Sequence, residues 1–416
     1  MSDTRMRPRS GRAPIARHGR LSAPNPAVGI VKFLAVAVCV VLVSAVSIVA
    51  IAFGKVSTGL RTVDIGGGPV PSIGAYSGAV NLLLVGSDTR EGQKGHYGTD
   101  PGSTLNDVNI LLHISEDHSK ATVISFPRDM YVNTPACKSP ATGAVMAAQT
   151  DVKINSILHT GGVACVRDTV ARLTGLTIPF LAMITFDGVV QMSNAIGGVE
   201  VCVAAPINDD YTELHLSKGV HTLKGSDALK FLRTRHGVGD GSDLTRISSQ
   251  QVFLSSLVRK LKAGSTLTDL TKLYGIASAA SHSMTLSTSL ANIETMVSIA
   301  RAVAPVDLNK VVFVQYPTAL QGGGVVPKTA AAAILMNAVA KDKTLRLSKP
   351  NAADAKGSVV EGSGSSSSGA SASSSASPSP KTTKKSSGST VTLPSDVLGQ
   401  TAAQKSCSVG NDLGTR

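Results

Sequence analysis

The strongest constraint on this chain is an uninterrupted apolar segment at residues 33–53, FLAVAVCVVLVSAVSIVAIAF. Its 21 residues include no charged side chain, Pro or Gly. A helix of that length rises roughly 30 Å, which matches the hydrocarbon core of a bilayer. We therefore expect one transmembrane helix over residues 33–53.

Basic residues are concentrated in front of this segment. The 416-residue chain has 40 Lys and Arg against 27 Asp and Glu, a formal net charge of +13, and residues 1–32 hold seven of the basic residues and one acid. Because basic flanks stay in the cytoplasm, we expect residues 1–32 there and residues 54–416 outside, in a single-pass protein of the cell membrane. A cleaved signal peptide with a weak site at Ala50 and Ala52 is the alternative, although its apolar region would be unusually long.

Composition divides the remaining chain into three parts. Residues 54–75 are rich in Gly and Pro and are expected to form a linker. Residues 76–345 alternate apolar runs with helical patterns and are expected to form the folded domain. Residues 346–416 lack aromatic side chains and include a Ser- and Gly-rich stretch, so we expect a disordered C-terminal tail.

The folded domain shows the pattern of a mixed α/β (α+β) protein. The runs predict strands at 80–86, 107–114, 121–126, 181–186 and 199–203, and helices near 162–175, 187–195, 226–232 and 244–262. This mixture predicts a central mixed sheet covered by helices.

Three charged residues are expected to meet at one end of this sheet. The connection between strands 107–114 and 121–126 is too short for a parallel crossover, so these strands should be antiparallel. If Ile114 pairs with Ala121, Asp107 faces Arg128, and an antiparallel strand 80–86 brings Asp88 to the same end. Two carboxylates and a guanidinium there suggest a site for a cation and a phosphate. Taken singly, each residue could instead belong to an ordinary turn or a solvated loop.

A second group of candidates lies further along the chain. Glycines follow Arg233 and Arg235 closely, so we expect both arginines to be extended and to project to the same side, where they can grip a phosphate. In the next helix Gln250 falls on the buried stripe one turn after Arg246, and either supports Arg246 or caps neighbouring backbone. Lys153 is a weaker candidate.

The five cysteines predict structural bridges and no zinc site. Cys39 lies in the apolar segment, and Cys137, Cys165, Cys202 and Cys407 are expected outside the cytoplasm, where disulfides persist. Four cysteines allow three pairings, which the sequence leaves open. Neither CxxC nor HExxH spacing occurs.

Five motifs in order give the chain a resemblance to a known family. They are NLLLVGSDTR at 81–90, LNDVNILLHI at 105–114, ISFPRDMYV at 124–132, KIN at 153–155, and FLRTRHGVGDGSDLTRISSQQ at 231–251. Over about residues 76–265 the chain resembles the LytR-CpsA-Psr family of bacterial cell-envelope enzymes. The resemblance implies an apolar pocket for a polyprenyl chain with a pyrophosphate at its mouth. It also implies phosphotransfer of a polyprenyl-pyrophosphate-linked glycopolymer to a peptidoglycan acceptor, with release of polyprenyl phosphate.

The resemblance also assigns residues. Asp88 and Asp107 resemble the carboxylates associated with Mg²⁺, for which Mn²⁺ is a possible substitute. The pyrophosphate-binding set that it implies is Arg128, Arg233, Arg235, Arg246, Gln250 and Lys153, and the catalytic set is Asp107, Arg128 and Arg246.

Three other functions compete with this one. A polyprenyl-pyrophosphate hydrolase would use the same residues with water as acceptor. A non-catalytic scaffold that binds the lipid-linked polymer fits the departures from the family pattern at Leu105 and Ser249. A net charge of +13 is also typical of a DNA-binding regulator, but the expected topology places the folded domain outside the cell, so no nucleic-acid partner is expected.

Overall fold

The computed structural model describes residues 61–66, 78–95, 97–98, 102, 104–140, 142–263, 280, 283–291, 293–348, 357–361 and 390–411. The expected cytoplasmic tail and transmembrane helix, over 1–32 and 33–53, lie outside the described residues. Within the described part, no helix combines the length and apolarity needed to cross a membrane.

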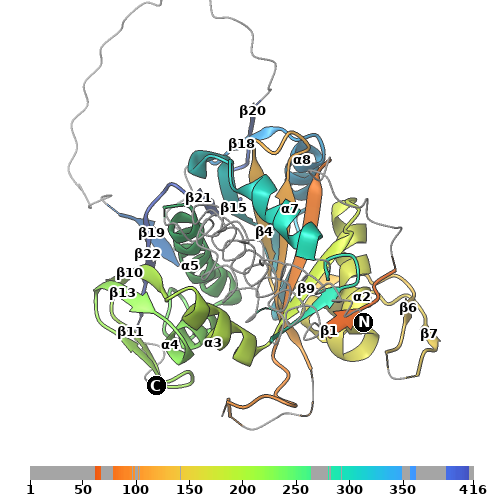
Figure 1. The fold of residues 1–416 in the computed structure, drawn as a ribbon, viewed down its shortest axis with the longest axis horizontal. Coiled ribbons are helices and arrows are strands. Elements are labelled where there is room, and N and C mark those ends of the chain that lie inside the picture. Colours follow the sequence, from red (N-terminus) through yellow and green to blue (C-terminus); the bar gives the residue numbers. More distant parts are fainter. Residues whose placement is uncertain are drawn as a thin grey trace, which may run out of the picture. The chain divides into compact units, whose positions relative to one another are not determined.

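A mixed sheet forms the centre of the folded domain (Figure 1). In the described residues it has eight strands, in the order β1-β14-β9-β2-β3-β4-β15-β21. Strand β3 is antiparallel to both of its neighbours, whereas β2 is parallel to β9 and β4 to β15. The strands are β1 (Arg61–Val63), β2 (Val80–Ser87), β3 (Asn106–Ile114), β4 (Ala121–Phe126), β9 (Phe180–Ile184), β14 (Met284–Ser287), β15 (Val311–Gln315) and β21 (Gly399–Thr401).

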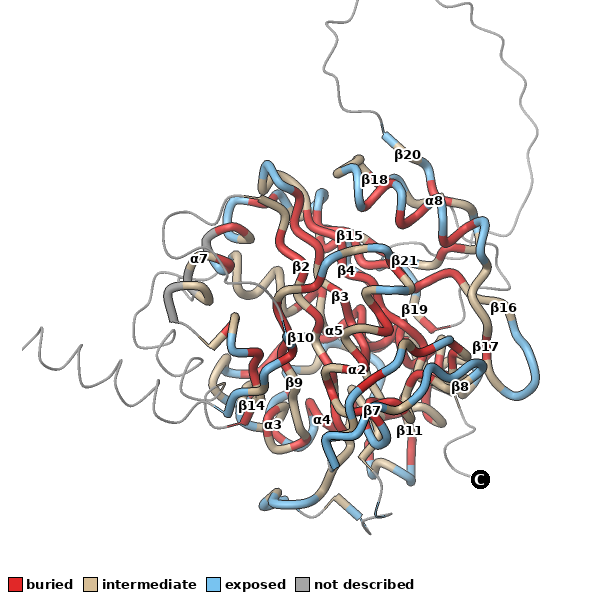
Figure 2. Tube along the Cα trace, turned by 90° about the vertical axis from the view of Figure 1, so that its right-hand side faces the viewer, coloured by how far each residue is buried: buried red, intermediate tan, exposed pale blue. Residues whose placement is uncertain are grey.

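Helices cover both faces of the sheet, as the sequence predicts. Helices α2 (Ile157–Thr174) and α8 (Thr329–Ala340) pack against one face, where Leu83, Leu111 and Ile124 point. Helices α5 (Asp243–Ala263) and α7 (Ile293–Val303) contribute to the core on the other face, which contains Ile110 and Phe313. Alternating strand residues thus serve two cores, and the central strands β2, β3 and β4 are largely buried (Figure 2).

Helix α5 also packs against a second sheet. In the described residues this sheet has the order β13-β10-β22-β19, and Phe253 of α5 joins its core together with Phe231. Its strands are β10 (Val199–Ala205), β13 (Gly219–Leu223), β19 (Ser358–Val360) and β22 (Ser406–Val409). Because α5 is buried from two sides, its polar residues near the N-terminus are held in fixed positions.

Shorter elements connect these layers. Helix α4 (Ser226–Arg233) packs against α5, and α3 (Phe186–Ala195) packs against α4 (Figure 1). The remaining elements are β5 (Tyr131–Val132), β6 (Cys137–Lys138), β7 (Val145–Met146), β8 (Val152–Lys153), η1 (Ile154–Ser156), β11 (Ile207–Asp209), β12 (Leu214–Leu216), η3 (Leu308–Lys310), β16 (Thr318–Gln321), β17 (Gly324–Pro327), β18 (Thr344–Arg346) and β20 (Thr390–Thr392).

The structure corrects two of the expected boundaries. Residues 61–63 of the expected linker form β1, which pairs with β14 at the sheet edge. The expected tail 346–416 contributes β19, β20, β21 and β22, and only parts of it, such as 362–389, lie outside the described residues. Amino-acid composition did not predict these strands. A short strand that joins an existing sheet edge gains its hydrogen bonds from its neighbour and needs little apolar surface of its own.

Two disulfides settle the pairing that the sequence left open. Cys137 bonds to Cys165, 28 residues away, and Cys202 bonds to Cys407, 205 residues away. Cys202 and Cys407 face each other in the parallel pairing of β10 and β22. The second bridge therefore fixes the C-terminal strands to the domain.

We expect the double substitution Cys202→Ser and Cys407→Ser to lower the free energy of unfolding by about 3–5 kcal/mol, because the bridge closes a very long loop. Urea denaturation followed by circular dichroism measures this loss. Cys137→Ser with Cys165→Ser is the matched control and should cost less. An unchanged free energy in the first variant would mean that β22 stays docked without its bridge.

Candidate functional site

Strand register brings Asp107 and Arg128 together as predicted. Ile114 pairs with Ala121, and the ladder runs on to Asn109 opposite Phe126. Just beyond it, Arg128 Nη1 donates a hydrogen bond to Asp107 Oδ1 at 2.9 Å. The predicted contact is confirmed.

Asp88 reaches the same end of the sheet from β2. Strands β2 and β3 are antiparallel, and Asp88 and Leu105 exchange hydrogen bonds just past the last pair. A Cβ at Gly86 would lie 2.8 Å from the Cβ of Val108, so a glycine permits this close approach. Burial and the neighbouring charge of Asp107 raise the pKa of Asp88, although Leu105 N–H and Arg90 act in the opposite direction.

A buried ion network ties this end of the sheet to α5. Asp243 accepts a hydrogen bond from Arg128 N at 2.8 Å and pairs with Arg246 Nη2 at 2.6 Å. Arg246 Nη2 also donates to the carbonyl oxygen of Asp107 at 2.9 Å. Burial alone would lower the pKa of Arg128, but the carboxylates of Asp107, Asp243 and Asp129 hold this pKa above its ordinary value. Sequence reasoning overlooked Asp243, although its spacing three residues before Arg246 was a usable signal.

Arg233 and Arg235 depart from the expected arrangement. Arg233 is the last residue of α4 rather than extended, and its guanidinium lies 4.4 Å from the centre of the Phe186 ring. Among the described residues this guanidinium has charge interactions but no hydrogen bond. Burial and the positive charge of Arg90 lower the pKa of Arg233. Its charge is therefore available to an anion.

Arg235 points to a different place. Its Nε donates to the carbonyl of Gly241 at 2.9 Å, and its side chain lines a groove that does not include Arg233. The cause is Asp209, a fully buried carboxylate that accepts hydrogen bonds from Thr234 Oγ1 and from the backbone N–H groups of Arg235 and Gly237. These hydrogen bonds turn the chain sharply after α4. The prediction that Arg233 and Arg235 project to the same side is therefore wrong.

Gln250 and Lys153 have supporting contacts. Gln250 Nε2 donates to the carbonyl of Leu232 at 2.9 Å and so caps the end of α4, which is the second of the two roles expected for it. Lys153 Nζ lies 3.4 Å from Asp129 Oδ1 and does not line the apolar pocket. Asp129 in turn lies 3.9 Å from Arg128 Nε.

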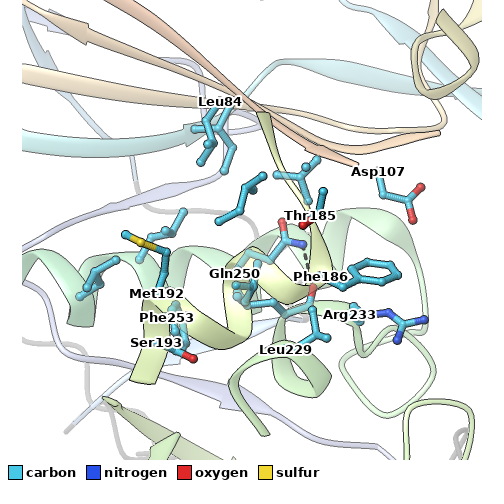
Figure 3. Close-up of a pocket in the computed structure, with 18 of the residues that line it drawn as sticks. Leu84, Asp107, Thr185, Phe186, Met192, Ser193, Leu229, Arg233, Gln250 and Phe253 are labelled. Carbon is cyan, nitrogen blue, oxygen red and sulfur yellow. Dashed lines mark hydrogen bonds between the residues drawn. The ribbon is translucent and has the colours of Figure 1, made fainter. Parts of the chain in front are cut away.

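An apolar pocket opens beside these charges (Figure 3). It has a volume of about 270 Å³ and lies between β2, β3 and β9 on one side and α3, α4 and α5 on the other. Leu84, Met192, Leu229 and Phe253 are among the residues that line its interior. Polar lining groups include Asp107, Arg233, Arg246 and Gln250. The pocket thus joins a hydrocarbon-lined interior to a charged group of side chains.

The loop after β2 is anchored next to this site by residues that the sequence did not single out. Asp187, in the first turn of α3, accepts hydrogen bonds from the backbone N–H groups of Lys94 and Gly95 and from Tyr97 Oη at 2.5 Å. Tyr97 stacks edge-on against Phe186, with ring centres 5.2 Å apart. Arg90 belongs to the same loop and therefore brings a second guanidinium toward Arg233.

The carboxylates suit magnesium better than zinc. The described residues contain no cluster of three or more His, Cys, Asp or Glu that could hold a metal. Asp88 and Asp107 lie close enough for their charges to interact, and Mg²⁺ needs only one or two carboxylates when a substrate phosphate completes its shell. The residues present therefore fit a phosphate-dependent Mg²⁺ site.

Comparison with known families gives a clear result. The model of the LytR_cpsA_psr family matches residues 57–346 of this chain. The chain belongs to the LytR-CpsA-Psr family. This membership confirms the resemblance carried by the five motifs.

Relatives of this LytR-CpsA-Psr protein are found in several bacteria. "Cell wall biosynthesis protein LcpA" of Corynebacterium glutamicum is 31% identical over 301 residues, which are 66% of this chain and 57% of the relative. TagT of Bacillus subtilis, named "Polyisoprenyl-teichoic acid--peptidoglycan teichoic acid transferase", is 28% identical over 193 residues, which are 45% of this chain and 54% of TagT. The chain therefore spans only a little over half the length of these relatives.

Solved structures support the fold. The "LytR-Csp2A-Psr enzyme from Actinomyces oris" has a TM-score of 0.50 and 20% identity, and the match covers 67% of this chain and 95% of that one. A protein from Streptococcus agalactiae gives a TM-score of 0.51 and 22% identity over 64% of this chain and 88% of the other. The mixed α/β architecture of the LytR-CpsA-Psr protein is therefore shared with these two solved structures.

We expect Asp209→Asn to lower the free energy of unfolding by about 3 kcal/mol at pH 7, because buried donors lose a charged acceptor. Hydrogen bonds from Thr234 and the backbone outweigh burial and depress the pKa of Asp209. Its contribution is therefore complete above the ordinary aspartate pKa of about 4 and is lost as the pH falls through the lower folded value.

Urea denaturation at several pH values tests this linkage. The stability difference between wild type and Asp209→Asn should be constant from about pH 7 to pH 5 and should shrink below about pH 4. The exposed neighbour offers the control Asp210→Asn, which should change little. A stability difference between wild type and Asp209→Asn that grows in acid would contradict a lowered pKa of Asp209 in the folded protein.

Proposed function

We propose that this chain transfers a glycopolymer from a polyprenyl-pyrophosphate carrier to peptidoglycan and releases polyprenyl phosphate. The names of the relatives support this choice: LcpA is named for cell wall biosynthesis, and TagT for teichoic acid transfer to peptidoglycan. The N-terminal apolar segment would anchor the enzyme in the cytoplasmic membrane, with the folded domain outside, where such carriers and the cell wall meet.

One observation carries the proposal. The apolar pocket has charged groups of both kinds in its lining, with Arg233 and Arg246 beside Asp107. An apolar interior suits a hydrocarbon chain, whereas guanidiniums and a carboxylate-bound cation suit a diphosphate. A polyprenyl diphosphate is a molecule that has both chemistries in one chain.

The proposed reaction is an in-line displacement at phosphorus. An acceptor sugar hydroxyl attacks the phosphorus nearest the glycopolymer, so that a new P–O bond forms while the P–O bond to polyprenyl phosphate breaks. The hydroxyl proton passes to one of the two aspartates, Asp88 or Asp107. Arg233 and Arg246, with Arg128 nearby, stabilise the charge that moves onto the departing phosphate.

Mg²⁺, or Mn²⁺ in its place, would be held by Asp88 and Asp107 together with substrate phosphate oxygens. When bound, it would neutralise charge on the diphosphate. Two hydrogen bonds support this proposal: Arg128 holds one oxygen of Asp107, and Leu105 N–H holds one oxygen of Asp88.

We expect Asp107→Asn and Asp88→Asn each to reduce the rate of transfer at least about 100-fold, because each removes a charge from the reacting centre. The assay uses a synthetic lipid-pyrophosphate-linked saccharide, peptidoglycan fragments and added Mg²⁺, with the full chain in detergent. Asp117→Asn is the matched control, because Asp117 is exposed at the opposite end of β3 and should leave the rate unchanged.

Wild-type rates in both variants would refute the site. Product analysis distinguishes the competing reactions. Release of polyprenyl phosphate without joining of saccharide to acceptor would indicate a hydrolase, and tight donor binding without turnover in wild type would indicate a scaffold.

We expect Val189→Trp to weaken donor binding at least about 10-fold, because the indole ring of tryptophan would occupy the pocket that Val189 lines. Binding of a fluorescent polyprenyl-diphosphate analogue measures the effect. Val220→Trp, at a site 63% exposed on β13, is the control for added bulk. Equal affinities in the two variants would place the lipid elsewhere.

A further inference from the structure

A second cavity, with polar and apolar lining residues, lies next to the ion network. It has a volume of about 860 Å³ and is formed by the β16–β17 hairpin, the residues after β4 and the start of α5. We call it the hairpin groove. Thr318, Gln321, Asp129, Arg235 and Asp240 are among its lining residues. None of the residues in this groove also lines the apolar pocket.

The wall of the hairpin groove is fixed in place. Val325 N donates to the carbonyl of Asp129 at 3.2 Å, and Met130 forms a bridge with Val325. Tyr131 Oη and Lys153 Nζ donate to the carbonyls at the hairpin tip, Gly322 and Gly323, at 3.3 and 3.4 Å. The β16–β17 hairpin projects from the domain and has exposed residues (Figure 2). The hydrogen bonds above hold it at its base and its tip.

Arg128 connects the hairpin groove with the apolar pocket. Its Nη1 contacts Asp107, which lines the pocket, and its Nε lies 3.9 Å from Asp129, which lines the groove. Its backbone N–H donates to Asp243, another groove residue. A phosphate held by Arg128 would therefore be within reach of both cavities.

The geometry of in-line displacement relates the two cavities to the two substrates, the lipid-linked donor and the acceptor. The attacking and leaving oxygens lie on opposite sides of the phosphorus. If the polyprenyl chain occupies the apolar pocket, the leaving phosphate faces that pocket. The acceptor must then approach from the side away from that pocket, and Arg128 lies beside the groove residue Asp129.

The lining chemistry suits a neutral, hydroxyl-rich molecule. The charges of the groove are largely compensated within the protein, because Asp129 pairs with Lys153, Asp243 with Arg246, and Lys328 with Asp396. Hydroxyl, amide and backbone groups of Thr318, Gln321 and the glycine tip add both donors and acceptors. Sugar hydroxyls and acetamido groups need this combination.

We propose that the hairpin groove binds the acceptor saccharide and directs its hydroxyl toward the phosphate at Arg128. This inference rests on the proposed function and assigns the place of its second substrate. Asp129 accepts a hydrogen bond from the acceptor, and the hairpin forms the side of the site that recognises the sugar. The donor lipid does not enter the groove.

Two groove variants test the assignment in the full chain. Ala319→Trp fills the groove from the hairpin, and Gln321→Ala removes one hydrogen-bonding group. We expect Ala319→Trp to abolish binding of a soluble peptidoglycan oligosaccharide and Gln321→Ala to weaken it up to about 10-fold. Both should leave the affinity for the polyprenyl-diphosphate analogue unchanged.

The controls match each change. Ala333→Trp lies at an exposed position of α8, and Gln191→Ala at an exposed position of α3. Neither should alter oligosaccharide binding. In the transfer assay, the groove variants should raise the KM for the acceptor and leave the KM for the donor as in wild type.

Binding is measured by saturation-transfer NMR in an Asp107→Asn background, so that it is independent of turnover. If wild type transfers no polymer but the oligosaccharide binds and Ala319→Trp removes that binding, the proposed function fails and the groove assignment stands. If Ala319→Trp in the Asp107→Asn background binds the oligosaccharide as tightly as Asp107→Asn alone, or if Asp107→Asn alone does not bind it at all, the groove assignment is overturned.

Discussion

The site depends on one buried ion network, in which Asp243 joins Arg128 to Arg246 while Arg128 also holds Asp107. Arg246 and Asp243 are the buried members, and removing one of them would leave a buried charge without its partner, which typically costs about 3–5 kcal/mol. The network therefore fixes the end of β4 to the first turn of α5. This connection sets the polar side of the apolar pocket at Asp107 and Arg246, and the part of the hairpin groove at Asp243.

The packing of α5 explains how the polar residues of the ion network can be buried. Its Leu254 and Val258 pack on the main sheet, and its Phe253 packs on the second sheet. The apolar contacts of the later turns hold the first turn rigid, so that Arg246 and Gln250 line the pocket without freedom to move away. A preorganised set of charges of this kind needs little rearrangement when charge develops on a phosphate.

The sequence predicted what depends on local pattern and strand register. The facing of Asp107 and Arg128 followed from a short antiparallel connection, and the strands and helices of residues 80–126 and 181–262 lie close to their expected bounds. The direction of Arg235 could not be predicted, because it depends on Asp209, a distant carboxylate with no pattern of its own. Strands β21 and β22 were missed for a related reason, since pairing partners far along the chain decide their structure.

Those late strands also bear on biogenesis. Strand β21 adds to the edge of the main sheet at β15, and β22 pairs with β10 and carries Cys407. Two sheets thus stay open at an edge until residues 399–409 are available to pair, after the helices that build the pocket. A nascent chain that waits with unpaired strand edges is exposed to misassembly with its neighbours. Pairing of these late strands, rather than formation of the pocket, would therefore set the moment at which this domain is protected from aggregation.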